Sequence, residues 1–342
     1  MHQRSNANYF FTSPHRIGFR STVAAFFAAV MACGAGLAQK PATPPPPDDP
    51  STGVFRVNTR LVVLHATVID KNGHLVTNLP RTAFQVYENN VVQSIKDFKR
   101  EDVPVSMGLI VDNSGSMRDK REKVKEAALD LVKDSNKEDE VFVVNFNDEA
   151  FLDLPHGKDF TNNIQEMEEA LTRIDSRGGT AMRDAIGMSI NHLKEKAHKD
   201  KKVLVVVTDG NDNSSVGSLE NLVKLSQQSE VLIYAVGLLS EEERREAKRA
   251  ERALKDLAEA TGGETFFPKE VTDVDRIAHQ VARDIRSQYT IQYAPVNQAM
   301  DGSYRQIKIA VNAPGKPTPR TRSGYYATPD QGVQAKTSQS FK

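Results

Sequence analysis

The chain divides into stretches that differ in how apolar and polar positions follow one another. Residues 53–102 contain short runs rich in β-branched residues, such as Leu61–Asp70, and no run with a helical period. Turn signals at Lys71–Gly73 and Glu88–Asn90 separate these runs. We therefore expect an N-terminal β segment, in which His74–Leu79 (HLVTNL) returns as a strand after the first turn.

Residues 103–288 have a different pattern, in which continuous apolar runs alternate with amphipathic stretches. Strands without internal alternation are buried on both faces, and strand–helix alternation is typical of a parallel sheet covered by helices. The sequence thus predicts an α/β fold with a doubly wound, mainly parallel sheet. The expected strands are Val105–Val111, Glu140–Phe146, Val203–Val207, Val231–Val236 and Glu264–Phe267. The expected helices are Lys120–Asp134, Ile164–Ile174, Met182–Lys196, Leu219–Gln228, Glu241–Ala260 and Val274–Ser287.

Residues 289–327 return to a β pattern, and residues 328–342 are polar and expected to be a disordered tail. Strands are expected at Gln288–Tyr293, Tyr304–Val311 and Thr321–Tyr326. Neither β segment alone has enough strands for a well-sealed sheet. We therefore expect one small β-domain, formed by the N- and C-terminal segments that flank the α/β domain.

The first 38 residues carry an export pattern. Arg4, Arg16 and Arg20 precede an uncharged run, Ser21–Ala38, which ends in small residues. This predicts a signal peptide over residues 1–38 that is cleaved after Ala38, and hence a secreted, periplasmic or cell-envelope location. The alternative is an uncleaved membrane anchor, although alanine and glycine make the run weakly apolar for a span.

Two further features of this region bear on location. Cys33, the only cysteine, follows a sequence (VMA) that resembles a lipoprotein cleavage box, so a lipid anchor at Cys33 is a second alternative. Residues 39–52 are rich in proline and are expected to form an extended linker. The 45 basic residues equal the 45 acidic residues in number, so the composition points neither to nucleic acid nor to an acidic membrane surface.

Candidate chemistry gathers at the ends of the predicted strands. Asp112 and Asp209 each end a buried strand, and ligands bind at the carboxyl ends of strands in open parallel sheets. Ser114 and Ser116 follow Asp112 at alternate positions, and a glycine-bearing loop delivers Thr180. These five side chains are hard oxygen donors, which suit Mg²⁺, Mn²⁺ or Ca²⁺. Because only two are carboxylates, a divalent ion there would favour one more anionic oxygen from a partner.

These residues carry a family resemblance. Asp112-x-Ser114-x-Ser116, Thr180 and Asp209 resemble the metal-ion-dependent adhesion site (MIDAS) of von Willebrand factor A domains, which have a Rossmann-like fold. The likeness covers about residues 103–288 and includes VDNSGSM, GGTAMRDAI, VLVVVTDG and LAEATGGETFF. The flanking segments and the final RSGYY also resemble secreted, acidobacterial proteins related to this A domain.

The resemblance implies roles for the five residues. Ser114, Ser116 and Thr180 would bind the ion through their hydroxyls, and Asp112 and Asp209 would act directly or through water. It implies an extracytoplasmic, non-enzymatic module for adhesion that binds a protein partner by capturing an Asp or Glu carboxylate on the metal.

Other functions fit the same residues less well. Each of the five alone could be a helix cap or turn residue. A Mg²⁺-dependent hydrolase or phosphotransferase would need a phosphate loop or a placed base, and the sequence has no GxxxxGK[ST] or G-x-S-x-G motif. A structural protein with a vestigial metal site is the third alternative. Asp212 is expected to be solvated, Asp184 to pack or cap within its helix, and the charged run Glu241–Arg252 to be a solvated helix face.

Overall fold

The computed structural model describes residues 60–329. The predicted signal peptide, the linker, Cys33 and all but the first two residues of the predicted tail lie outside this range. Within it, no helix has the length and apolar character needed to cross a membrane.

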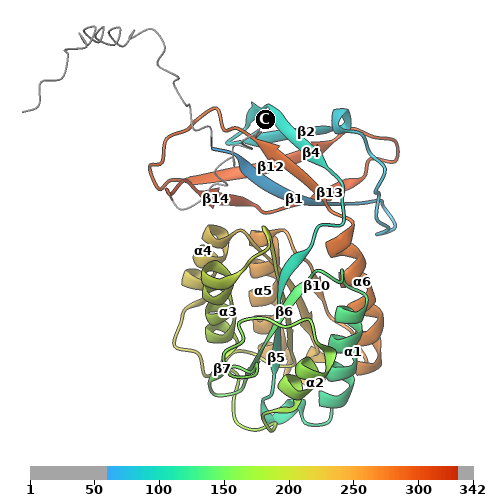
Figure 1. The fold of residues 1–342 in the computed structure, drawn as a ribbon, viewed down its shortest axis with the longest axis vertical. Coiled ribbons are helices and arrows are strands. Elements are labelled where there is room, and N and C mark those ends of the chain that lie inside the picture. Colours follow the sequence, from blue (N-terminus) through green and yellow to red (C-terminus); the bar gives the residue numbers. More distant parts are fainter. Residues whose placement is uncertain (1–59, 330–342) are drawn as a thin grey trace, which may run out of the picture. The chain divides into compact units, whose positions relative to one another are not determined.

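A six-stranded sheet forms the centre of the α/β domain (Figure 1), in the order β10-β9-β8-β5-β6-β7. Five strands are parallel, and only β7 at one edge runs antiparallel to its neighbour. Every residue of β5 is buried, as the unbroken apolar run predicts. The strands are β5 (Val105–Asp112), β6 (Glu140–Phe146), β7 (Ala150–Leu152), β8 (Lys201–Thr208), β9 (Val231–Gly237) and β10 (Thr265–Phe266).

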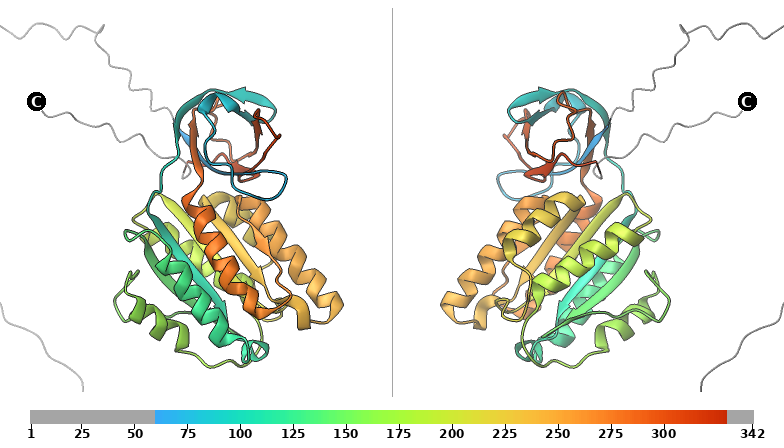
Figure 2. Two further views of the ribbon diagram at one scale, coloured as in Figure 1. Left: turned by 90° about the vertical axis from the view of Figure 1, so that its right-hand side faces the viewer. Right: turned by 90° about the vertical axis from the view of Figure 1, so that its left-hand side faces the viewer.

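Helices cover both faces of this sheet (Figure 2). One group packs α1 against both α2 and α6, and the other packs α4 against both α3 and α5. The helices are α1 (Arg121–Lys133), α2 (Ile164–Thr172), α3 (Met182–Lys196), α4 (Leu219–Ser229), α5 (Arg244–Thr261) and α6 (Val274–Arg286). The doubly wound, mainly parallel sheet expected from the sequence is therefore confirmed.

The flanking segments form a small β-domain, as expected. It contains two four-stranded sheets, β13-β1-β11-β4 and β14-β12-β2-β3, and each sheet combines strands from both ends of the described chain. The strands are β1 (Val62–Ile69), β2 (Phe84–Glu88), β3 (Val91–Gln93), β4 (Ile95–Lys99), β11 (Tyr289–Tyr293), β12 (Tyr304–Val311), β13 (Thr318–Arg320) and β14 (Gly324–Tyr326).

The β-domain has a hydrophobic core of its own, to which both sheets contribute. At its centre the Glu88 carboxylate accepts hydrogen bonds from the hydroxyls of Tyr293 (2.7 Å) and Tyr325 (3.0 Å). The expected turn between β2 and β3 is formed by Asn89 and Asn90, whose φ angles are 47° and 64°. Asparagine tolerates these left-handed angles, which a two-residue hairpin turn requires.

The predicted return strand at His74–Leu79 is wrong. The turn forms, because Asp70 accepts hydrogen bonds from the backbone of Asn72 and His74, but only the isolated bridge between Ile69 and Leu75 follows. The backbone further along this segment is bound by a side chain instead of by a strand, because the Tyr289 hydroxyl donates to the Val76 carbonyl (2.9 Å) and accepts the Leu79 N–H (2.9 Å).

The sequence also missed two strands and misplaced the start of a helix. The strands β7 and β13 have only three residues each, too few for an alternating pattern to show. Helix α5 begins at Arg244, where the Glu243 side chain caps its first turn, and not at Glu241. Leu239–Glu241 form a separate 3₁₀ turn, which removes Glu241 from the charged helix face.

Candidate functional site

Sheet register brings the predicted site residues to one edge of the α/β domain. β5 and β8 are parallel neighbours, with Val111 beside Val207. Asp112 therefore lies beside Thr208, the residue that directly precedes Asp209. The two carboxylates that the sequence places at strand ends are thus brought to the same carboxyl edge of the sheet.

Asp112 is almost fully buried, at 1% exposure. One carboxylate oxygen accepts the backbone N–H of Ser114 (2.8 Å), and the other accepts the hydroxyl of Thr208 (2.6 Å). Burial raises the pKa of Asp112 to about 6, against the lowering effect of these donors, and the nearby charge of Asp209 adds to the rise. This carboxylate is held by neutral donors alone.

The two serines connect Asp112 to Asp209. The hydroxyl oxygens of Ser114 and Ser116 lie 3.2 Å apart, and Ser116 donates a hydrogen bond to Asp209 (2.8 Å). Ser114 is buried, whereas Ser116 is exposed. Four of the five predicted residues therefore form one connected set of oxygens that runs from the sheet edge to the surface.

Thr180 joins this set through its loop. The backbone N–H of Gly115 donates to the carbonyl of Gly178 (3.2 Å), which ties the Thr180 loop to the serine turn. A methyl group added at Gly210 would lie 3.8 Å from the Thr180 hydroxyl oxygen, so that hydroxyl faces the residue after Asp209. The structure thus brings all five predicted residues to one site, on three converging loops.

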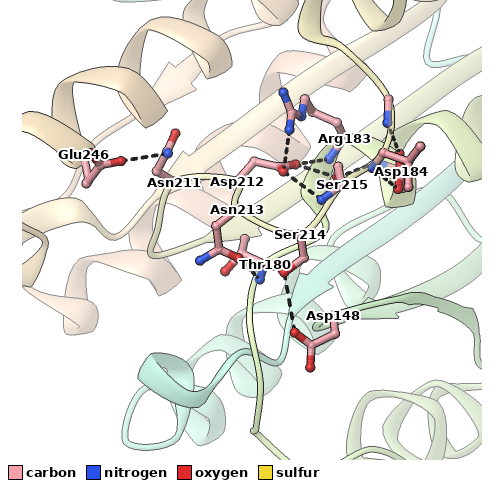
Figure 3. Close-up of polar contacts among 12 residues, drawn as sticks. Asp148, Thr180, Arg183, Asp184, Asn211, Asp212, Asn213, Ser214, Ser215 and Glu246 are labelled. Atoms are coloured by element: carbon pink, nitrogen blue, oxygen red, sulfur yellow. Dashed lines mark hydrogen bonds and ion pairs between the residues drawn. The ribbon is translucent and has the colours of Figure 1, made fainter.

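The loop after Asp209 fixes Thr180 from the other side (Figure 3). The Thr180 N–H donates to the side chain of Asn213 (2.9 Å), and its carbonyl accepts the N–H groups of Asn213 (3.1 Å) and Ser214 (3.2 Å). Gly178 has a φ of 73°, and a methyl group there would lie 2.0 Å from the Asp148 carboxylate. The positive φ favours glycine at this position, whereas the exposed Asp148 side chain could shift away from an added methyl group.

Two aspartates near Thr180 do not behave as expected. The side chain of Asp212 is only 5% exposed and accepts from both the backbone (2.7 Å) and the guanidinium (2.9 Å) of Arg183, so the expectation of a solvated residue is wrong. Asp184 accepts the N–H groups of Val216 (2.8 Å) and Gly217 (3.0 Å) instead of capping its own helix. Both carboxylates therefore bind the 211–217 loop to the start of α3 (Figure 3).

The sequence missed a lysine and two glutamates at the site. The ammonium group of Lys120 lies 2.8 Å from Asp209 and 2.8 Å from Glu241. The carboxylate of Glu242 lies 3.6 Å from the position of a methyl group on Gly210, and partial burial together with the charge of Asp209 raises its pKa. No spacing rule predicts these contacts, because Glu241 and Glu242 come from the loop after β9.

The donor chemistry fits a hard divalent cation. Asp112 and Asp209 each accept hydrogen bonds from the protein on both oxygens, and a carboxylate, which has about four lone-pair sites, can accept further partners. The other proposed metal ligands are neutral hydroxyls, those of Ser114, Ser116 and Thr180. Such a set suits Mg²⁺, Mn²⁺ or Ca²⁺.

Fold and site together define an α/β domain with a carboxylate- and hydroxyl-rich site at the carboxyl edge of its sheet. The sequence profile of the von Willebrand factor type A domain matches residues 107–283, and the chain belongs to this family. Domains of this family commonly bind a divalent metal at the MIDAS.

Two relatives each match about a third of the chain. The chain is 31% identical to integrin alpha-11 of Mus musculus over 110 residues, which is 31% of this chain and 9% of the integrin. It is 28% identical to inter-alpha-trypsin inhibitor heavy chain H4 of Bos taurus over 120 residues, 32% of this chain and 13% of that protein. The chain thus spans a small part of the length of either relative.

The solved structures that this chain resembles are more distant in sequence. A von Willebrand factor type A protein from Catenulispora acidiphila is 16% identical, with a TM-score of 0.48 over 80% of this chain and 74% of that one. The proximal thread matrix protein 1 of the mussel byssus is 14% identical, with a TM-score of 0.42 over 55% of this chain and 49% of that one, and is described with a zinc-occupied MIDAS motif.

Proposed function

We propose that the protein is a non-enzymatic, metal-dependent binding module that captures a carboxylate of a protein partner. Asp112, Ser114, Ser116, Thr180 and Asp209 would hold the ion, with Mg²⁺ as the first candidate and Mn²⁺ or Ca²⁺ as alternatives. The observation that carries this proposal is the connected set of oxygens from buried Asp112 through both serines to Asp209. When bound, the ion would supply an electrophilic position for one more anionic oxygen.

The surroundings of the site support a protein partner that offers an Asp or Glu. Val216, in the loop that holds Thr180, is 96% exposed, and Phe151, on the edge strand β7, is 37% exposed. Such side chains would supply apolar contacts around a central ionic one, as is usual at protein interfaces. Ser116 is the exposed member of the oxygen set, and would lie nearest to the partner.

Location belongs to the same proposal. The export pattern of residues 1–38 supports a secreted, periplasmic or cell-envelope protein, with the membrane involved only through an N-terminal anchor. The equal numbers of acidic and basic residues give no support to a nucleic-acid partner.

Titration calorimetry with Mg²⁺ and Mn²⁺ tests the metal site. The wild type should bind one ion, and Asp112→Ala and Thr180→Val should weaken binding by about tenfold or more, because each removes a donor group. Thr180→Val removes only the hydroxyl, since the hydrogen bonds that hold Thr180 use its backbone. Asp119→Ala is the control, because Asp119 is an exposed carboxylate of the same turn. Equal loss in Asp119→Ala, or no binding by the wild type, would refute the site.

A pull-down from extracellular or envelope material tests the binding function. Wild type and Asp112→Ala are compared with Mg²⁺ and with EDTA. A genuine partner should be retained only by the wild type and only with metal. Partners that remain bound in EDTA would count against a metal-dependent function.

A further inference from the structure

Lys120 is the cationic side chain that the structure places directly on the proposed metal site. Its side chain is 11% exposed, and its ammonium group binds Asp209, which is 1% exposed, and Glu241, which is 75% exposed. Asp209 is therefore engaged on both oxygens, one by Ser116 and the other by Lys120. A divalent ion at the site would share Asp209 with a positive charge that belongs to the protein.

The position of Lys120 is unfavourable for a lysine in other respects. It is the residue directly before α1, at the end of the helix where the backbone dipole is positive and disfavours cations. A buried ammonium group also loses hydration. The ion pairs with Asp209 and Glu241 offset both costs, so Lys120 is held at the site by these two carboxylates and not by its helix.

The same contacts join three loops. Lys120 belongs to the turn that carries Ser114 and Ser116, Asp209 follows β8, and Glu241 belongs to the 3₁₀ turn after β9. The single ammonium group of Lys120 thereby pairs with two carboxylates, one of a proposed metal ligand and one of a surface glutamate. Removing Glu241 would leave the Lys120 ammonium group paired with Asp209 alone, and removing Lys120 would leave Asp209 with the hydrogen bond from Ser116.

We propose that Lys120 sets the metal affinity of the site, acting as a built-in cation that competes with the metal for Asp209. This inference rests on the proposed metal site. Lys120 weakens metal binding, and with the metal in place it adds positive charge beside the position that the partner carboxylate would take. Glu241 has the opposite effect on metal affinity, because it binds the same ammonium group and so weakens the hold of that group on Asp209.

Calorimetric titration of the full chain with Mn²⁺ at fixed ionic strength tests this inference. Lys120→Met keeps the length of the side chain and removes the charge, and it should bind Mn²⁺ about tenfold more tightly than the wild type. Glu241→Gln should bind Mn²⁺ more weakly than the wild type. Lys123→Met is the matched control, because Lys123 lies on the same helix in an exposed pair with Glu126, and its affinity should be unchanged.

Thermal unfolding in EDTA and in saturating Mn²⁺ separates this role from a merely structural one. Lys120→Met should lower the Tm in EDTA, since it leaves Asp209 buried without its cation. Mn²⁺ should then raise the Tm of Lys120→Met by more degrees than it raises the Tm of the wild type. A structural role alone would lower both Tm values equally and leave the Mn²⁺ affinity unchanged.

The outcomes distinguish the inference from the metal site itself. Equal Mn²⁺ affinity in the wild type and Lys120→Met, with both folded, would leave the metal site standing and overturn the role of Lys120. If neither protein binds Mn²⁺, the metal site is wrong and the inference falls with it. Tighter binding by Lys120→Met together with weaker binding by Glu241→Gln is the expected result.

Discussion

Asp112 shows, at the scale of a single residue, how a binding site conflicts with folding. It is a buried carboxylate whose two oxygens contact neutral donors, and burial raises its pKa to about 6. An ionised carboxylate in this position costs free energy in the metal-free chain. A bound metal ion would remove that cost. Metal binding would therefore explain why this aspartate is buried without a cation from the protein.

The raised pKa of Asp112 gives a pH prediction for the chain in EDTA. The folded state holds the proton more tightly than the unfolded state, so this group favours folding below about pH 4 and loses that contribution as the pH rises to about 6. Asp112→Asn has no such loss. Its free energy of unfolding, relative to the wild type, should therefore rise by about 1.4 kcal/mol per pH unit over this range, to about 3 kcal/mol.

Urea denaturation in EDTA at several pH values between 4 and 7 measures this difference. Asp119→Asn, an exposed site in the same turn, should show no such trend. A constant difference between Asp112→Asn and the wild type across the range would show that Asp112 titrates normally.

Glycines decide how tightly elements can approach one another. Helix α5 is followed by Gly262, whose φ of 86° gives the left-handed cap that glycine favours. The next residue, Gly263, packs against β9, and a methyl group there would lie 1.9 Å from the carbonyl oxygen of Ile233. The chain can pass from α5 to β10 along this path only because neither residue has a side chain.

Substitution of two glycines should therefore have opposite effects. Gly263→Ala should lower the free energy of unfolding by about 3 kcal/mol, because a rigid backbone atom stands in the way. Gly187→Ala, in the middle of α3 with open space around it, should raise it by about 0.5–1 kcal/mol. Chemical denaturation measures both, and equal effects would refute this account of Gly263.

The β-domain depends on the whole chain. Strand β1 pairs with β11 and β13, β4 pairs with β11, and β2 pairs with β12, so the N-terminal strands depend on partners that follow the α/β domain. The first and last described segments thus fold together, although more than 180 residues separate β4 from β11.

Truncation after Ser287 tests this dependence. It removes β11 to β14, so that of the four strands in residues 62–99 only β2 and β3 keep a partner. A single short hairpin is not stable alone, so residues 62–99 should lose their protection from hydrogen exchange. The buried strands β5, β8 and β9 should stay protected as in the full chain, since their partners remain. Persistent protection of residues 62–99 in the truncated chain would mean that the N-terminal segment folds alone.

The sequence by itself determined most of the elements and named the candidate site residues. Period and turn chemistry are local, so β6 and α3 begin and end at the residues that the sequence predicts. Polar residues at the ends of two buried strands, and a glycine-bearing loop between them, were enough to name all five residues of the proposed site. Parallel strands align their carboxyl ends, which makes this inference available without coordinates.

Only the tertiary structure decided what surrounds those residues. Lys120 contacts Asp209 across 89 positions of the chain, and Glu241 contacts Lys120 from a turn that the sequence assigned to a helix. The return strand at His74–Leu79 fails for the same kind of reason, because Tyr289 of the distant strand β11 binds the backbone of Val76 and Leu79. Such contacts depend on which loops and edges converge, and local pattern carries no information about that.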